Sequence, residues 1–300
     1  MSNELLHSRV EGQTAIAIGV FDGLHLGHQH LLQRLCAEAA ALHCTPMVVS
    51  FQRHPSCVLG RREEELWLTE EWERESLLHS MGIEVCVLPF TPELYTLSAC
   101  QFVEQYLVGR LHMRMLLLGY DSRFGSRQND DFDRLPLLSE HLGFTLLRDE
   151  PYLHDGCVVS STLIRQSLAQ GDVAMASRLL GKDYCVYGTV EHGRADGRRI
   201  GFPTANVSLA HCRKMMPLQG VYAVRLQCDG REWKGMANWG SQPTFEGDSA
   251  ILEVHLFQFE GSLYGREVSV SFTRRLRDIR KFPTLDELIA QLNIDKEVAQ

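Results

Sequence analysis

Residues 19–28 have the sequence GVFDGLHLGH, and this stretch determines how the first half of the chain is expected to fold. The apolar run just before it, residues 14–19, predicts a buried strand. A helical pattern begins near Gly27 and places three leucines on one face. Residues 19–28 are therefore predicted to form the turn that joins a strand to the N-terminus of a helix.

Two histidines flank the start of this helix, where the first backbone N–H groups have no partner inside the helix. Gly23 and Gly27 would let an anionic ligand approach the main chain. His25 and His28 add two imidazoles to these free amides. The combination predicts a triphosphate site of the HxGH kind, distinct from the lysine-bearing loop of the Walker type. The alternative is an ordinary turn histidine followed by a helix-start histidine.

A second element supports the phosphate interpretation. Residues 160–165 have the sequence SSTLIR, in which hydroxyl groups precede a predicted helix. Ser161 and Thr162 can cap the helix, and Arg165 in its first turn can offer a guanidinium to phosphate oxygens. A plain helix cap would also explain the three hydroxyls.

Composition limits the possible functions. The chain has 300 residues, 44% of them hydrophobic, which suffices for two domains. Its net charge of −8 argues against a general nucleic-acid binder. The nine cysteines include no C-x-x-C pair, as expected of reduced thiols in a cytosolic protein. No leader-like N-terminus and no run of eighteen apolar residues is present, so we expect a cytoplasmic protein without a membrane span.

Apolar runs alternate with helical patterns over the first 150 residues. Their hydrophobicity is continuous, which is typical of strands covered on both faces and hence of a parallel sheet. Ligands bind beyond the carboxyl ends of such strands. The predicted strands are residues 14–19, 47–51, 84–90, 115–119 and 144–147, and the predicted helices are 28–42, 70–81 and 98–108.

The pattern changes after Gly181. β-like runs separated by turn residues follow, and only residues 284–292 have a helical pattern, with a capping box at Thr284 and Glu287. We therefore predict an α/β plus β protein: a Rossmann-like domain with a parallel sheet, then a small antiparallel β-barrel with a terminal helix. The predicted barrel strands are residues 184–191, 221–228, 233–238, 251–257 and 267–273.

The two phosphate motifs together resemble the nucleotidyltransferase superfamily that transfers AMP from ATP. Residues 50–55, SFQRHP, and 119–125, GYDSRFG, narrow the resemblance to bacterial bifunctional riboflavin kinase/FAD synthetases. Residues 197–206, GRRIGFPTAN, are similar to the kinase signature of that family. GVYA, GMAN, PTF, LEVHL and LYG follow in the family's order, at 220–223, 235–238, 243–245, 252–256 and 263–265. The resemblance implies an FMN adenylyltransferase domain at 1–182 and a riboflavin kinase domain at 183–300.

In the adenylyltransferase reaction that this resemblance implies, the phosphate of FMN attacks the α-phosphorus of ATP, and pyrophosphate leaves. The enzyme then acts by positioning its substrates and stabilising charge, with His28 as the central residue. The implied ATP-binding residues are Gly19, Phe21, Asp22, His25, Gly27, His28, Ser161, Thr162 and Arg165. The implied flavin-binding residues are Phe51, His54, Asp121 and Phe124, for which a strand end plus a turn is the alternative.

The implied kinase reaction needs a base and a divalent cation. Glu253 is the expected base, although a solvent-facing glutamate on a strand is the simpler interpretation without the resemblance. Thr204 and Asn206 can both direct an oxygen to one Mg²⁺. Gly201 and Pro203 are expected to complete the kinase ATP site.

Some positions depart from the family's pattern. Leu163 stands where arginine is common, and the other departures are Ser122, Asn129, Trp239 and Gln242. We expect riboflavin, FMN and ATP as small-molecule substrates, no nucleic acid or membrane partner, and a monomer or weak homo-oligomer. A kinase-only enzyme with a degenerate first half and a flavin-sensing regulator are the two alternative functions.

Overall fold

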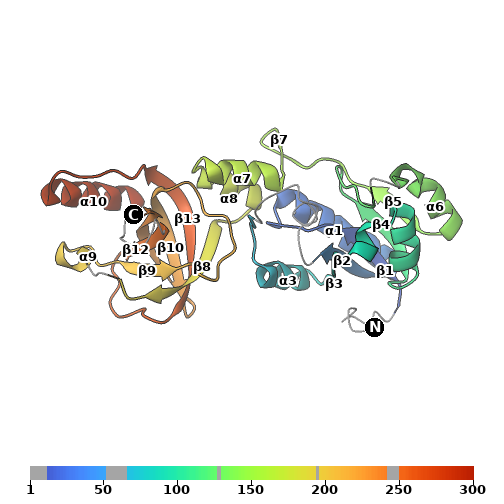
Figure 1. The fold of residues 1–300 in the computed structure, drawn as a ribbon, viewed down its shortest axis with the longest axis horizontal. Helices are drawn as coiled ribbons and strands as arrows, with labels where there is room; N and C mark the ends of the chain where they lie inside the picture. Colours follow the sequence, from blue (N-terminus) through green and yellow to red (C-terminus); the bar gives the residue numbers. More distant parts are fainter. Residues whose placement is uncertain (1–11, 52–65, 127–129, 194–195, 242–249) are drawn as a thin grey trace. The chain divides into compact units, whose positions relative to one another are not determined.

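A buried central strand organises the first half of the molecule in the computed structural model, which describes residues 12–51, 66–126, 130–193, 196–241 and 250–300. The chain divides into two compact units, Met1–Val159 and Ser160–Gln300. The first unit has a parallel five-stranded sheet in the order β3-β2-β1-β4-β5 (Figure 1). These strands are β1 (Thr14–Ile18), β2 (Thr45–Phe51), β3 (Glu84–Leu88), β4 (Met113–Leu118) and β5 (Thr145–Arg148).

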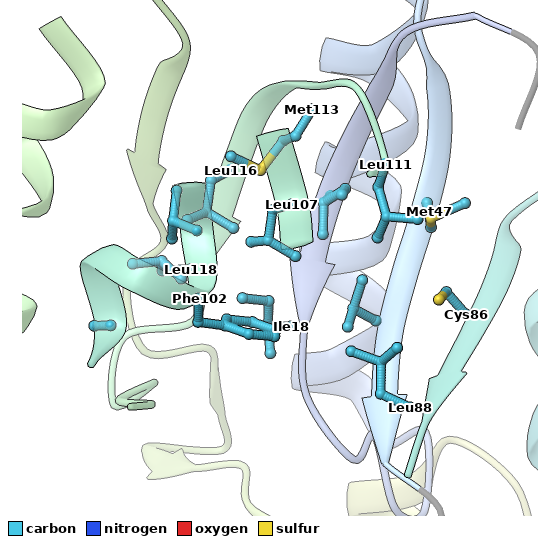
Figure 2. Packing of buried hydrophobic residues seen from close by; sticks show 14 of the residues in the cluster. Ile18, Met47, Cys86, Leu88, Phe102, Leu107, Leu111, Met113, Leu116 and Leu118 are labelled. Atoms are coloured by element: carbon cyan, nitrogen blue, oxygen red, sulfur yellow. The ribbon is translucent and has the colours of Figure 1, made fainter. Parts of the chain in front are cut away.

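Helices cover both faces of this sheet. Ile16 and Ile18 face one hydrophobic cluster, which includes Phe102 and Leu107 (Figure 2), whereas Ala15 and Ala17 face the other. This two-sided burial confirms the prediction made from the continuous apolar runs. The helical elements are α1 (Leu26–Ala41), α3 (Glu71–Ser80), α4 (Pro92–Tyr95), α5 (Ala99–Phe102), the π-helix η1 (Val103–Val108), the 3₁₀ helix η3 (Phe132–Arg134) and α6 (Leu135–Leu142).

The strand order determines where a ligand can bind. From β1 the chain passes through α1 to β2 and then outward to β3, before it crosses to β4 on the other side of β1. The order therefore reverses at β1, and the carboxyl ends of β1 and β4 meet at the switch point that binds ligands in open α/β sheets. The turn containing His25 and the turn containing Asp121 follow these two strands. A small hairpin of β6 (Leu153–His154) and β7 (Cys157–Val158) ends the unit.

The second unit contains a closed antiparallel barrel in the order β10-β11-β12-β9-β8-β13, which confirms the predicted barrel. Its strands are β8 (Tyr184–Glu191), β9 (Ala205–Ser208), β10 (Gly220–Cys228), β11 (Arg231–Ser241), β12 (Ala250–Leu256) and β13 (Glu267–Arg277). The sequence analysis missed β9, because four residues directly after a proline-containing segment show too little alternation. The helices are α7 (Ser161–Ala169), α8 (Val173–Leu180), α9 (Asp196–Arg199) and α10 (Leu285–Ala299).

A buried ion pair holds the terminal helix α10 against the barrel. Asp295, only 3% exposed, accepts hydrogen bonds from Nε and Nη2 of Arg277 on β13, the shortest at 2.7 Å. Gln291 Nε2 also donates to Asp295 at 2.7 Å. The carboxylate therefore has partners that compensate for its loss of hydration.

Helices α7 and α8 are grouped with the barrel, whereas the predicted domain boundary, at 182/183, lies after them. The amide of Leu218 donates to Leu168 O of α7 at 2.9 Å. The amide of Tyr184, in β8, donates to Ser177 Oγ of α8 at 3.4 Å. The amphipathic face of α8 is buried, including Leu179 and Leu180.

We expect a fragment of residues 160–300 to be more stable than a fragment of residues 183–300, although both should fold. The shorter fragment would lose the apolar face of α8, and each buried leucine is worth about 1.5–3 kcal/mol. Thermal unfolding followed by circular dichroism should give a midpoint higher by at least about 5 °C for the longer fragment. Equal midpoints would mean that the two helices contribute no stability to the barrel.

Candidate functional site

The turn between β1 and α1 has an unusual backbone. Phe21, Gly23 and Leu24 all have positive φ values, of 51°, 89° and 42°. The left-handed region is costly for phenylalanine and leucine. Both side chains are buried, at 5% and 3% exposed, and the amide of Leu24 donates to Phe21 O at 3.1 Å. The turn is therefore held in one conformation by its packing.

The two histidines of this turn lie face to face at the helix start. Their ring centroids are 3.6 Å apart, with 15° between the planes. His25 is the N-cap of α1, and its Nδ1 accepts the amide hydrogen of His28 at 3.2 Å. Because this Nδ1 is an acceptor, neutral His25 carries its proton on Nε2. A Cβ on Gly27 would lie 3.3 Å from the His25 ring, so glycine allows this close approach.

His28 is held in its neutral form. Burial, with a smaller contribution from nearby His25, lowers the pKa of His28 well below its usual value of 6.5. Its Nδ1 is buried and has no hydrogen-bond partner among the residues that the structure describes. Since buried polar atoms are normally paired, this nitrogen is suited to meet a ligand.

Asp22 behaves differently from the histidines beside it. Its carboxylate is 3% exposed and accepts hydrogen bonds from the amides of Leu68 and Thr69. The acidic group therefore faces the protein, although Asp22 was predicted to bind ATP. Gly19 lies at the end of β1, where a Cβ would be 3.0 Å from the Phe21 ring.

Two of the predicted flavin-binding residues pack in or against the apolar core on one face of the sheet. Phe51 is 8% exposed and packs edge to face on Phe90, with ring centroids 5.3 Å apart. Phe124 contacts the rings of Phe102 and Phe132 at 5.8 and 5.2 Å. Phe51 is therefore buried, whereas Phe124 is half-buried.

Of the other two predicted flavin-binding residues, Asp121 and His54, the structure describes only Asp121. Asp121 is exposed and follows β4. A guanidinium that the sequence analysis missed lies next to this turn, since Arg148 Nη1 donates to Tyr120 O at 3.2 Å. Arg148 ends β5, and only the strand order reveals that it neighbours the end of β4. His54 is outside the described residues.

The SSTLIR segment begins α7, as predicted. The side chain of Ser160 caps the helix by accepting the amide hydrogen of Leu163 at 3.3 Å. Ser161 and Thr162 are the first residues of the helix, and Thr162 is exposed. This helix belongs to the second unit, so its joint action with His28 stays a prediction.

A row of polar residues crosses four strands of the barrel. The register aligns Glu253 with Asn206 on one side and Asn238 on the other, and Asn206 with Glu191. Both chain neighbours of Glu253 are fully buried apolar residues, whereas Glu253 is half-buried. Because side chains alternate along a strand, the row lies on the outer face of the barrel. Asn238 was missed because pairing between strands cannot be read from one strand.

The segment before β9 is fixed around this row. A Cβ on Gly193 would overlap the side-chain amide of Asn206, and one on Gly197 would lie 3.6 Å from Thr204 Oγ1. Glycine at position 193 therefore lets the Asn206 side chain pack against the main chain, and glycine at position 197 is required because a Cβ would lie 2.3 Å from Phe202 O. Pro203 O bonds to Nδ1 of His255 at 2.8 Å, and burial lowers the pKa of this histidine.

The other residues of this segment, 201–206, differ in backbone conformation and exposure. Gly201 adopts a left-handed φ of 84°, which glycine tolerates. Pro203 is exposed, and Thr204 and Asn206 are half-buried. Phe202 packs edge to face on His255, with ring centroids 5.2 Å apart. The polar atoms predicted to meet ATP therefore border a well-packed segment.

Two features are absent from the described part of the chain. It holds no group of three or more His, Cys, Asp or Glu residues that could bind a metal ion. None of its helices is both long enough and apolar enough to cross a membrane.

Comparisons with known proteins cover nearly the whole chain. A family model described as FAD synthetase matches residues 7–163, and one described as riboflavin kinase matches residues 180–300. The chain is 37% identical to the bifunctional riboflavin kinase/FMN adenylyltransferase of Haemophilus influenzae, over 98% of this chain and 95% of that one. It is 36% identical to that of Escherichia coli K12, over 95% and 91%.

A solved structure has the same fold. It is described as a macrolide-efflux protein from Streptococcus pneumoniae and matches with a TM-score of 0.86 and 32% identity. The match covers 97% of this chain and 95% of that one. The arrangement of a parallel sheet followed by a barrel is therefore shared over nearly the full length.

The lowered pKa of His28 predicts a pH dependence of stability. Below about pH 6.5 the unfolded chain takes up a proton at this residue and the folded chain does not. The free energy of unfolding therefore decreases as the pH is lowered, until the pKa of His28 in the folded chain is reached. Urea unfolding at pH 7.5 and 5.5 should therefore show a larger loss of stability for the parent than for His28→Asn, by about 1 kcal/mol. His30→Asn, at an exposed position of α1, is the matched control. Equal losses for the parent and His28→Asn would contradict the prediction.

Proposed function

The chain belongs to the family of bifunctional riboflavin kinase/FMN adenylyltransferases, and from this premise we propose which of its residues carry each reaction. It phosphorylates riboflavin to FMN and then transfers AMP from a second ATP to FMN, giving FAD and pyrophosphate. We assign FMN adenylylation to residues 1–182 and riboflavin phosphorylation to residues 183–300. The observation that carries the kinase assignment is the alignment of Glu253 between Asn206 and Asn238.

In the kinase reaction the ribityl hydroxyl of riboflavin attacks the γ-phosphorus of ATP, and ADP leaves. The hydroxyl must lose its proton, and Glu253 is the proposed acceptor. Its two amide neighbours can orient the carboxylate and the sugar chain by hydrogen bonds. The half-buried position keeps Glu253 within reach of a substrate on the outer face of the barrel.

The residues beside Glu253 are suited to a hard cation. Thr204 and Asn206 supply neutral oxygen atoms, and both side chains are half-buried. These oxygens fit Mg²⁺ that is also bound by ATP phosphates, where the cation would neutralise phosphate charge. We propose that Gly201 and Pro203 complete the ATP-binding segment.

In the adenylyl transfer the phosphate of FMN is already an anion and needs no base. We propose that His25, His28 and the amides around Gly27 bind the ATP phosphates, together with Gly19 and Phe21. Their support is the stacked histidine pair and the Nδ1 of His28, which has no hydrogen-bond partner in the described part of the chain. Family resemblance adds Ser161, Thr162 and Arg165 as ligands of the departing pyrophosphate.

The flavin side of this reaction is assigned on the same resemblance. We propose that Phe51, His54, Asp121 and Phe124 determine where the isoalloxazine ring binds. The exposed turn at Asp121 favours direct contact, whereas the buried ring of Phe51 and the half-buried ring of Phe124 favour support through packing. We further propose a cytoplasmic protein that acts as a monomer or weak homo-oligomer and binds no nucleic acid.

The departures from the family pattern leave these assignments in place. Trp239 is anchored through Nε1, which donates to Pro217 O at 3.0 Å, so it has a structural partner in the barrel. Ser122 lies next to Gly119, where a Cβ would be 2.9 Å from its hydroxyl. Leu163 is half-buried, and Asn129 and Gln242 lie outside the described residues.

Purified protein given riboflavin, ATP and Mg²⁺ should form FMN first and FAD later, with ADP and pyrophosphate as by-products. His28→Ala should abolish FAD formation and spare FMN formation, because the kinase assignment uses none of the first 182 residues. Chromatography of the flavins over time measures both activities in one sample. If FMN and ATP supplied directly to the parent give no FAD, the bifunctional assignment fails.

Glu253→Gln should lower kinase turnover by about 10²–10⁴-fold, because the amide cannot accept the proton. Riboflavin binding and FMN adenylylation should change little. Glu191→Gln is the matched control, since this exposed carboxylate is also aligned with Asn206. A normal rate for Glu253→Gln, or a comparable loss for Glu191→Gln, would assign the base elsewhere.

A further inference from the structure

The strained turn before α1 requires support from outside itself. Phe21 and Leu24 flank Asp22 and Gly23, and the backbone of both adopts the left-handed region. Such conformations cost about 1–3 kcal/mol each and persist only where the surroundings impose them. The neighbouring contacts should therefore show what fixes the turn.

Those contacts come from a segment 46 residues away in sequence. Oδ1 of Asp22 accepts hydrogen bonds from Leu68 N at 2.9 Å, Thr69 N at 3.0 Å and Thr69 Oγ1 at 3.1 Å. The Thr69 hydroxyl in turn accepts the amide hydrogen of Gly23 at 3.1 Å. The hydroxyl thus connects the carboxylate and the turn amide. We call this set of hydrogen bonds the Asp22–Thr69 clasp.

The far side of the clasp is rigid. Leu68 and Thr69 are 1% and 2% exposed. Helix α3 begins two residues after Thr69, and a capping box formed by Glu70 and Glu73 closes its first turn. Its Leu78 packs in the same cluster as the leucines of α1. The clasp therefore ties the turn to an element that the core already fixes.

The direction of the Asp22 carboxylate indicates its role. A carboxylate aimed at a triphosphate would repel it, whereas this one receives amide and hydroxyl hydrogens from the protein. We propose that Asp22 and Thr69 are positioning residues of the adenylyltransferase site. They hold the turn so that its amides, His25 and His28 meet the phosphates of ATP, and neither contacts ATP. This inference rests on the proposed function of the HxGH turn.

Thr69→Val tests the clasp with little change of shape. It removes the hydroxyl and leaves the buried amide of Gly23 without its acceptor. In the folded variant the adenylyltransferase KM for ATP should rise by about 5- to 30-fold, with the KM for FMN and the kinase KM for ATP unchanged. Thr69→Ser keeps the hydroxyl and should restore the KM for ATP.

A matched control is available at the other end of β1. Thr14 is fully buried, and its hydroxyl donates to Leu111 O at 2.7 Å, far along the strand from the HxGH turn. Thr14→Val should lower the unfolding midpoint and leave the KM for ATP at the parent value. Comparison of Thr14→Val with Thr69→Val therefore distinguishes the general effect of losing a buried threonine hydroxyl from the specific effect of losing the clasp.

Each outcome decides the proposal. A folded Thr69→Val protein with the parent KM for ATP, or a Thr14→Val protein with the same rise, would overturn it. If Thr69→Val does not fold, Asp22→Asn and Thr69→Ser decide by the same KM measurement, and a failure of Asp22→Asn to fold would make the clasp a determinant of stability alone. A parent protein that forms no FAD would instead refute the proposed function.

Discussion

Burial of β1 on both faces requires helices on both sides of the sheet, because all five of its residues are apolar or hydrogen-bonded inside the protein. Parallel neighbours can then be reached only by crossover connections. These crossovers bring the carboxyl ends of the strands to one edge. The turn that follows β1 occupies the centre of that edge, where the strand order reverses. The position of the proposed phosphate site follows from the burial of a single strand.

In the barrel, side chains alternate along each strand between the core and the outer face. Leu252 and Val254 point into its core, which forces Glu253 between them to the outer face. Pairing with β9 and β11 then places an asparagine on each side of this carboxylate. The proposed proton acceptor is thus fixed on a strand, whereas the histidines proposed for adenylyl transfer lie at a turn. The difference agrees with the chemistry, since only the kinase substrate must be deprotonated.

Patterns local in sequence allowed most of the fold to be predicted. Five strands of the sheet, the helix after β1 and the terminal helix all show apolar periodicity within one segment. The sequence could not predict β9, because it is short and is stabilised by its partners. Nor could it predict that Thr69 supports residues 22–23, since no local pattern records a contact 46 residues away. The prediction that Asp22 binds ATP came from its place in the motif, whereas the direction of its carboxylate, toward the amides of Leu68 and Thr69, is seen only in the structure.

The direction in which individual groups point also explains how a chain of net charge −8 can bind ATP and FMN through their phosphates. Attraction must come from groups close to the anion, because exposed charges farther than about 10 Å are screened by salt. At the HxGH turn the groups proposed for this role are backbone amides and a neutral His28, while the carboxylate of Asp22 is paired with protein N–H groups. The helix start can therefore act on a phosphate without a surrounding basic surface. Net charge argues against a general nucleic-acid binder, but the orientation of individual dipoles determines which anion the proposed site can hold.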